Sequence, residues 1–246
     1  AREKARTEWD EALRRHDFQT AWSKAVAMSR LDQVMVDDAK RLLTCMGIPY
    51  VEAPGEGEAQ AAAMAARGDV WAANSRDYDT LLFGSPRLVR YLTVSGKEFL
   101  PSKGVSRRLK PELVELSDFL KHHGITREQL IDLAIAVGTD FNEGIKGIGT
   151  KTALKLVKRY GRLEDFPENL RDNIPGEVET IRNIFLHPNV VLDYSISQQA
   201  MNEEALFTFL CSERGFSHER VNTAVERMRT ISKQRQESGL QSWLDT

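Results

Sequence analysis

The sequence predicts an α/β fold with a parallel sheet, followed by a mainly helical C-terminal half. Three observations point to it: a strand–helix–strand pattern over residues 48–73, acidic pairs after both expected strands, and helical periodicity from about residue 126. Strand, helix and strand at this spacing form a unit whose two strands run parallel. The 246 residues, 41% of them hydrophobic, suffice for one large domain or two small ones.

Two amphipathic helices are predicted at the start of the chain. Apolar residues recur at helical spacing up to Leu13 and again from Phe18 to Ala25, with a polar break at residues 15–17. Because the sequence begins with Ala1 inside a predicted helix and not with Met, we expect further chain upstream.

The elements of the expected core follow in order. A third helix should end at Gly47, where a short strand at residues 48–51 begins. An alanine-rich helix over residues 59–66 has side chains small enough to lie close to a sheet, and a second strand covers residues 70–73. Residues 88–100, interrupted by Ser95-Gly96, predict a β-hairpin.

Helices dominate the second half. Thr126 and Gln129 form a capping box at the start of one helix, which Gly138 ends. A glycine-rich turn and a basic helix at residues 150–160 follow, and the pattern stays mostly helical to Lys233.

The carboxylates are the first candidate site. Two short pairs follow the two expected strands, and one further aspartate follows the helix that ends at Gly138: Glu56 and Glu58, Asp77 and Asp79, and Asp140. In an open α/β sheet the carboxyl ends of the strands are where ligands bind, so we expect the pairs to lie together. Carboxylates this close repel one another unless a cation joins them, and oxygen ligands without cysteine or histidine favour Mg²⁺ or Mn²⁺ over zinc. Two such ions can clamp the attacking and leaving oxygens of a phosphodiester.

Each pair also has a simpler interpretation. Glu56 and Glu58 favour the N-terminus of a helix, and Asp77 and Asp79 are common in turns. Two pairs at equivalent topological positions favour the metal site.

The second candidate site is a glycine turn followed by a basic helix. Gly147 and Gly149 precede it, as in a helix-hairpin-helix turn, where glycines let the backbone approach a phosphate. Residues 144–162 contain no acid and six basic residues, Lys146, Lys151, Lys155, Lys158, Arg159 and Arg162. A one-sided stripe of this kind would hold a duplex backbone without reading its sequence. The alternative is a solvated surface helix.

Composition narrows the class of protein. The net charge of −2 gives no sign of nucleic-acid binding. The negative charges of acidic metal ligands and the positive charges of a basic stripe can, however, offset one another in the net charge of the chain. The two cysteines, Cys45 and Cys211, form no CxxC pair, which excludes a zinc ribbon or a disulfide framework and fits a reducing compartment. No apolar stretch is long enough to span a bilayer, and there is no signal peptide.

Four ordered motifs resemble those of the flap endonuclease family, and the details look archaeal. The matching segments are residues 46–50 (MGIPY), 53–59 (APGEGEA), 77–84 (DYDTLLFG) and 138–149, which opens with Gly-Thr-Asp and closes with Gly-Ile-Gly. The resemblance implies a five-prime nuclease (PIN-like) α/β core, a helix-hairpin-helix DNA-binding region, and a helical arch through which a single-stranded 5′ flap passes. Residues 1–30 would belong to that arch, or else form a plain surface hairpin.

The resemblance also implies an activity: structure-specific cleavage of branched DNA near the single-strand/duplex junction, in Okazaki fragment processing and repair. The residues matching Glu56, Glu58, Asp77, Asp79 and Asp140 would coordinate two catalytic Mg²⁺ ions, which Mn²⁺ can replace. Backbone carbonyls of Gly144, Ile145 and Ile148 would hold K⁺. DNA contacts would come from Lys146, Gly147, Gly149, Lys151, Lys155 and Lys158.

The C-terminus resembles the start of the family's sliding-clamp motif. Gln241 and Leu244 have the spacing of its glutamine and aliphatic residue, and the family's aromatic pair would follow Thr246. Residues 234–239 are polar, so we expect a flexible tether there. The expected partners are therefore branched DNA and a ring-shaped clamp, with no membrane. The expected state is a monomer, cytoplasmic in an archaeon and nuclear in a eukaryote.

We expect one nuclease domain, N-terminally incomplete. Its parts would be the arch at 1–30, the α/β core at 31–124, the helix-hairpin-helix region at 125–165, C-terminal helices at 166–233 and the tail at 234–246. Family members carry an upstream strand with two further metal-binding aspartates, so activity of this chain alone depends on chain outside it. Two alternatives remain: a sibling exonuclease or repair nuclease of the same superfamily, and a non-catalytic DNA- and clamp-binding fragment.

Overall fold

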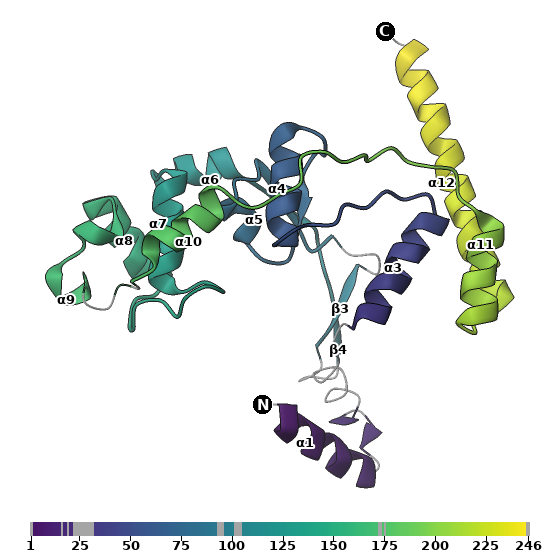
Figure 1. Cartoon of the computed structure of the whole chain (residues 1–246), viewed down its shortest axis with the longest axis horizontal. Helices are drawn as coiled ribbons and strands as arrows, with labels where there is room; N and C mark the ends of the chain where they lie inside the picture. Colours follow the sequence, from purple (N-terminus) through teal and green to yellow (C-terminus); the bar gives the residue numbers. More distant parts are fainter. Residues whose placement is uncertain are drawn as a thin grey trace. The chain divides into compact units, whose positions relative to one another are not determined.

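The computed structural model describes residues 2–15, 17–18, 20–21, 32–92, 96–100, 105–171, 174 and 176–244 (Figure 1). The chain divides into two compact units. The first comprises Ala1–Ala25 and Glu52–Leu192, and the second comprises Val26–Val51 and Asp193–Thr246. This grouping differs from the expected single domain, because residues 26–51 belong with the C-terminal segment and not with the α/β core.

The first unit contains a three-stranded sheet. Its strands are β1 (Ala73–Asn74), β2 (Arg87–Arg90) and β5 (Glu112–Glu115), in the order β1-β2-β5. β1 and β2 run parallel, whereas β2 and β5 run antiparallel. A separate antiparallel pair joins β3 (Lys97–Leu100) to β4 (Val105–Arg108).

The predicted hairpin between residues 88–94 and 97–100 is wrong. β2 has strand partners on both sides, and Leu88 on it is fully buried. Tyr91 then adopts a φ of 60°, which ends the extended backbone immediately after Arg90. β3 therefore pairs with the strand that follows it.

The first unit also contains helices. In chain order they are α1 (Arg2–Arg14), α4 (Gly57–Arg67), α5 (Asp79–Leu82), α6 (Leu116–His123), α7 (Arg127–Val137), α8 (Thr150–Tyr160), η1 (Leu163–Asp165), α9 (Glu168–Arg171) and α10 (Val178–Leu186). The predicted capping box of α7 is confirmed, since both Thr126 and Gln129 bond the other's backbone. The alanine-rich α4 buries Ala59 and Ala62 in the same core as Leu88, as its small side chains predicted. α1 confirms the first expected helix, and most of the second lies outside the described residues.

A buried ion pair fastens α7 to α10. The guanidinium of Arg182 donates to both oxygens of Asp132 at 2.6 and 2.8 Å, and the two side chains are 9% and 3% exposed. The backbone N–H of Leu163 donates to the same carboxylate at 3.1 Å. One aspartate on α7 therefore bonds both η1 and α10.

The second unit is helical in its described parts. It contains α3 (Gln33–Cys45), α11 (Glu203–Phe207), the π-helical segment η2 (Thr208–Glu213) and α12 (His218–Leu244). Its core consists of Cys45, Leu206, Val221 and Val225. The N–H groups of Gly47 and Ile48 close the end of α3 by bonding carbonyls of its last turn, at 3.1 and 2.9 Å.

Residues 48–51 do not form the predicted strand. The N–H of Ile48 is already used by α3, Pro49 has no N–H, and the carbonyl of Gly47 accepts from Gln199 at 2.9 Å. The carboxylates at 56 and 58 thus follow an irregular segment and not a strand.

The prediction of a flexible tether at residues 234–239 is also wrong, because α12 continues through these residues to Leu244. Glutamine, arginine, glutamate and leucine dominate residues 234–241, and all four are good helix formers, so the single Gly239 does not stop the helix. Among the helices that the structure describes, none combines the length and the apolar character that a membrane crossing requires.

Candidate functional site

The five predicted carboxylates come from three places in the first unit. Glu56 is the N-cap residue of α4 and Glu58 lies in its first turn. Asp77 follows β1, Asp79 opens α5, and Asp140 lies in the turn after α7. Asp79 and Glu58 are half-buried, while the other three are exposed.

The other four carboxylates of this group all affect the pKa of Asp79. Burial of its carboxyl group, and then the negative charges of the other four, raise the pKa of Asp79 above its usual value; these four are Glu58, Asp140, Asp77 and Glu56. The structure thus brings α4, the loop after β1 and the turn after α7 within electrostatic reach of one another. A region of this kind attracts a cation, which lowers the repulsion between the carboxylates.

The donor set fits divalent ions. All five are hard oxygen ligands of the type that Mg²⁺ and Mn²⁺ prefer. Within the described parts of the chain, no three acidic, histidine or cysteine side chains converge on one point closely enough to hold a single ion. A site with two ions roughly 3.5–4 Å apart spreads its ligands, so convergence on one point is not required.

Ser75 connects the two carboxylate pairs, and the sequence prediction missed it. Its hydroxyl donates to a carboxylate oxygen of Glu58 and accepts the backbone N–H of Asp77 at 3.1 Å. The first pair is thereby tied to the loop that carries the second. A serine two residues before an aspartate is a common turn pattern, so only the position of Glu58 in space makes it significant.

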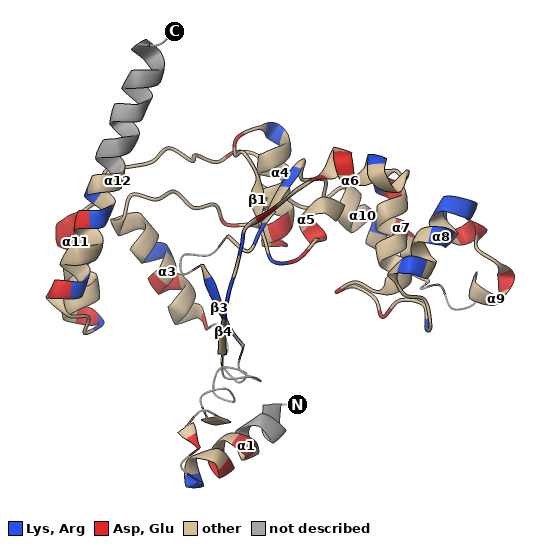
Figure 2. Cartoon of the chain, turned by 180° about the vertical axis from the view of Figure 1, so that it is seen from behind, with Lys and Arg blue, Asp and Glu red and all other residues tan. Residues whose placement is uncertain are grey.

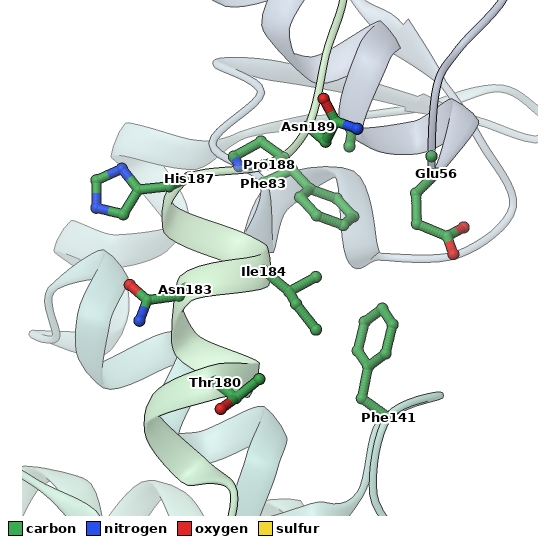
Figure 3. A pocket seen from close by; sticks show the side chains of 11 residues that line it. Glu56, Phe83, Phe141, Thr180, Asn183, Ile184, His187, Pro188 and Asn189 are labelled. Atoms are coloured by element: carbon green, nitrogen blue, oxygen red, sulfur yellow. The ribbon is translucent and has the colours of Figure 1, made fainter.

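A cavity of about 510 Å³ borders Glu56 (Figure 3). Phe83, Phe141 and Ile184 provide most of its apolar wall, and α10 forms one side. The ring of the buried Phe185 lies behind this wall, 5.0 Å from the Phe83 ring and 5.6 Å from the Phe141 ring between centroids. Of the five carboxylates, Glu56 thus borders a cavity with a partly aromatic lining.

The glycine turn folds back on the end of α7. Ile145, which is 4% exposed, donates its N–H to the carbonyl of Ala136 at 2.8 Å. Gly144 has a φ of 74°, and a Cβ there would lie 2.4 Å from the carbonyl oxygen of Val137, so only glycine fits. Of the carbonyls expected to hold K⁺, that of Ile145 already accepts the N–H of Ile148 at 3.0 Å, and an oxygen has a second lone pair available.

α8 presents the predicted basic stripe. Lys151, Lys155 and Lys158 are exposed, whereas Ala153 and Val157 on the opposite side are fully buried. Figure 2 marks basic positions along this helix in blue. Lys146, Gly147 and Gly149 are exposed in the preceding turn. Gly149 is the N-cap residue of α8 and has no side chain that could accept a hydrogen bond. The first backbone N–H groups of α8 therefore have no side-chain cap.

The expected clamp-binding residues, Gln241 and Leu244, lie in the last turns of α12, in the second unit. They belong to a different unit from the five carboxylates.

Comparisons with known proteins agree with these features. The family model described as the XPG I-region matches residues 47–140, which include all five carboxylates. Flap endonuclease 1 of Pyrococcus horikoshii is 47% identical over 244 residues, which cover 99% of this chain and 70% of that protein. Flap endonuclease 1 of Archaeoglobus fulgidus is 50% identical over 230 residues, covering 94% and 68%.

Solved structures show the same relationship. The flap endonuclease-1 from Methanococcus jannaschii matches with a TM-score of 0.72 at 41% identity, covering 89% of this chain and 65% of that one. The catalytic core of Rad2 in complex with a DNA substrate shares the fold, with a TM-score of 0.68 at 21% identity over 81% of this chain and 71% of that one. The predicted fold class, a PIN-like nuclease core, is confirmed, and the chain belongs to the flap endonuclease 1 family of nucleases.

Proposed function

We propose that this chain is the main part of a 5′ flap endonuclease that hydrolyses a DNA phosphodiester near the single-strand/duplex junction during replication and repair. The observation that carries the proposal is that Glu58, Asp140, Asp77 and Glu56 all act electrostatically on the half-buried Asp79. Membership of the flap endonuclease 1 family supports it.

The five carboxylates are the ligands of two divalent ions in this proposal, Mg²⁺ or, as a substitute, Mn²⁺. When bound, such ions stabilise the charge that develops on the attacking and leaving oxygens. The chain's own residues orient the site: Ser75 holds Glu58 against the loop of Asp77. Burial, and then the repulsion from the other carboxylates, raises the pKa of Asp79, and this concentration of negative charge makes the site selective for cations.

In this proposal, DNA binds to the turn after α7 and to α8. Lys146, Lys151, Lys155 and Lys158 would contact phosphates, and Gly147 and Gly149 would let the backbone approach them. Their exposure and the absence of acids from residues 144–162 support this role. K⁺ at the carbonyls of Gly144, Ile145 and Ile148 would add positive charge next to the same phosphate.

We further propose that Gln241 and Leu244 recruit a sliding clamp. Because α12 continues to Leu244, a helix and not a tether would present these two residues to the clamp. Titration of Leu244→Ala against the cognate clamp tests this assignment, and unchanged affinity would place the contact elsewhere.

The substitution Asp79→Ala tests the nuclease assignment. In the complete protein it removes the carboxylate on which the other four act electrostatically, so cleavage of a 5′-flap substrate should fall by about a thousandfold or more, equivalent to roughly 4 kcal/mol of lost transition-state stabilisation. Binding of the same DNA should remain, because phosphate contacts lie elsewhere.

The matched control is Asp118→Ala, an exposed acid on α6 in the same unit. Its cleavage rate should equal that of the wild type. Near-normal turnover of Asp79→Ala with Mg²⁺ present would refute the metal site. A wild-type protein that binds flap DNA without cutting it would favour the alternative, a DNA- and clamp-binding fragment.

A further inference from the structure

Arg90, the last residue of β2, holds the loop that carries Asp77 and Asp79. Its Nε and Nη2 both donate to the carbonyl oxygen of Arg76, at 3.1 and 3.0 Å. Its Nη1 donates to the hydroxyl of Tyr78, and the centre of the guanidinium lies 4.0 Å from the Tyr78 ring centroid. The side chain of Arg90 is only 11% exposed.

The residues that Arg90 contacts alternate along the chain with the residues that carry the carboxylates. Arg90 binds residues 76 and 78, whereas the proposed metal ligands are residues 77 and 79. The N–H of Asp77 is fixed separately by the Ser75 hydroxyl at 3.1 Å, and the N–H of Ser75 bonds the carbonyl of Val89 at 3.3 Å. The backbone on both sides of Asp77 is therefore held, while its carboxylate is left exposed.

An ordinary ion pair does not explain this arrangement. The nearest carboxylate partner of Arg90 is Glu112, at 3.4 Å with a side chain that is 57% exposed, and such a pair contributes little stability. The other bonds of the guanidinium go to the neutral carbonyl of Arg76 and to the hydroxyls of Tyr78 and Tyr91, the latter at 2.8 Å, and the group lies over both rings. A planar group that donates from two nitrogens to one carbonyl oxygen and also stacks on aromatic rings is specific to arginine, and lysine cannot reproduce it.

We infer that Arg90 is a positioning residue for the metal-binding carboxylates: it fixes the loop at residues 75–79 so that Asp77 and Asp79 are in place before a divalent ion binds. This inference rests on the proposed metal site. Residues that orient metal ligands in this indirect way typically change metal affinity or activity by about 10–100-fold when they are replaced.

The substitution Arg90→Lys tests it, because lysine keeps the charge and loses the paired bonds and the stacking. Mn²⁺ binding to the protein without DNA, followed by electron paramagnetic resonance of the free ion, should weaken by about tenfold or more. In metal-free protein, amide hydrogen exchange of residues 75–83 should become faster. At saturating Mn²⁺ most of the turnover number should return, since the ligands themselves are intact.

Arg87→Lys is the matched control on the same strand. Arg87 donates to the carbonyl of Trp71 at 2.8 Å and lies 3.6 Å from Glu115, so it does not hold the acidic loop. Neither Mn²⁺ affinity nor exchange at residues 75–83 should change in this variant. Tyr78→Leu provides a second test if Arg90→Lys fails to fold, because Tyr78 is 53% exposed and its loss removes one stacking partner and one hydrogen-bond acceptor of Arg90.

The outcomes separate this inference from the proposed function. If wild-type protein binds Mn²⁺, Asp79→Ala does not, and Arg90→Lys and Tyr78→Leu bind like the wild type, the positioning role is overturned and the metal site stands. If Asp79→Ala binds Mn²⁺ as well as the wild type does, the metal site itself is overturned. Weaker binding in Arg90→Lys with an unchanged Arg87→Lys supports both.

Discussion

Ser75 is the residue that joins the two carboxylate pairs, so its loss should disturb both at once. Ser75→Ala removes the donor to Glu58 and the acceptor of the Asp77 N–H. Glu58 would then be free to swing away from Asp79. Cleavage at limiting Mg²⁺ should fall by about tenfold, with a smaller loss at saturating Mg²⁺. A titration of cleavage rate against Mg²⁺ concentration measures both effects.

Ser117→Ala serves as the control, since Ser117 is an exposed serine on α6. Its Mg²⁺ titration should superimpose on that of the wild type. A Ser75→Ala curve that also superimposes would show that Glu58 does not need its hydrogen bond.

The site could be predicted from the sequence only in part. The carboxylates are identified by residue type and by pairing along the chain, which a sequence displays directly. Ser75 and Arg90 act through contacts with Glu58 and the residue-76 carbonyl, which depend on how α4 and β2 lie against the loop after β1. Serine and arginine are common in turns and on strands, so nothing in their local sequence distinguishes these two.

At the scale of elements, the Asp132–Arg182 pair should be one of the strongest contributions to the packing of α10. Asp132→Ala leaves the Arg182 guanidinium buried without its main partner and leaves the Leu163 N–H without an acceptor. Breaking a buried pair from one side costs about 3–5 kcal/mol. We expect about 3 kcal/mol, because Arg182 also bonds Glu164 at 2.6 Å. Urea unfolding followed by tryptophan fluorescence measures the loss.

The double variant Asp132→Leu with Arg182→Met separates charge from packing. It removes both charges together, so it should be more stable than Asp132→Ala. Asp118→Ala, at an exposed site, should stay within about 0.5 kcal/mol of the wild type. If Asp132→Ala also stays within that range, the pair does not fix α10.

α8 carries the prediction for DNA binding. Replacing Lys151 and Lys155 together by glutamine removes two exposed charges without touching the buried face of Ala153 and Val157. Affinity for all duplex-containing substrates should fall alike. The slope of log affinity against log salt should drop by about 1.8, because each phosphate contact contributes roughly 0.9. Fluorescence anisotropy across a salt series gives both values.

Lys110 and Lys121, which are also exposed lysines of the first unit, provide a control pair of the same charge. Their replacement by glutamine should leave the slope unchanged. Equal slopes for both pairs would mean that α8 is a solvated surface and holds no phosphate.

Helices were easier to predict than strands for a physical reason. α7 and α8 carry their start and stop signals locally, in Thr126, Gln129 and the flanking glycines. Strands depend on partners far along the chain. Residues 88–94 have the composition of a hairpin strand, but β2 pairs with β1 and β5 instead. Residues 48–51 have suitable side chains, but the N–H of Ile48 is engaged by α3 and the carbonyl of the preceding Gly47 is engaged by Gln199.

At the scale of the whole molecule, the second unit should be sensitive to acid. The hydrogen bond from Arg214 lowers the pKa of Asp38, and the hydrogen bond from Arg41 lowers the pKa of Glu213. Both arginines also lie over the ring of Phe209. The folded-state pKa values are below those of the unfolded chain. The stabilisation is therefore present above the usual carboxyl pKa of about 4 and is lost as the pH falls through the lowered values.

Scanning calorimetry between pH 3 and pH 6 at low salt checks this prediction, because both pairs are exposed enough to be screened. The combined variant Arg41→Gln and Arg214→Gln should flatten the pH dependence of the transition that reports the second unit. Arg220→Gln, at an exposed position of α12, should not. An equally steep dependence in the combined variant would assign the acid sensitivity to other groups.

The division of the chain into two units has a consequence for how the protein is made. Residues 52–192 of the first unit are continuous, and the second unit consists of the segments on either side of them. A ribosome releases the chain from its N-terminus, so all five carboxylates, which lie between residues 56 and 140, emerge before any of residues 193–246 exist. Cys45, by contrast, must wait for Leu206 and Val221, its partners in the second core. Long-range contacts of this kind form late, so the segment with the five carboxylates should be folded while α3 is still without its core. A chaperone that protects the growing chain would therefore have α3 as its first substrate.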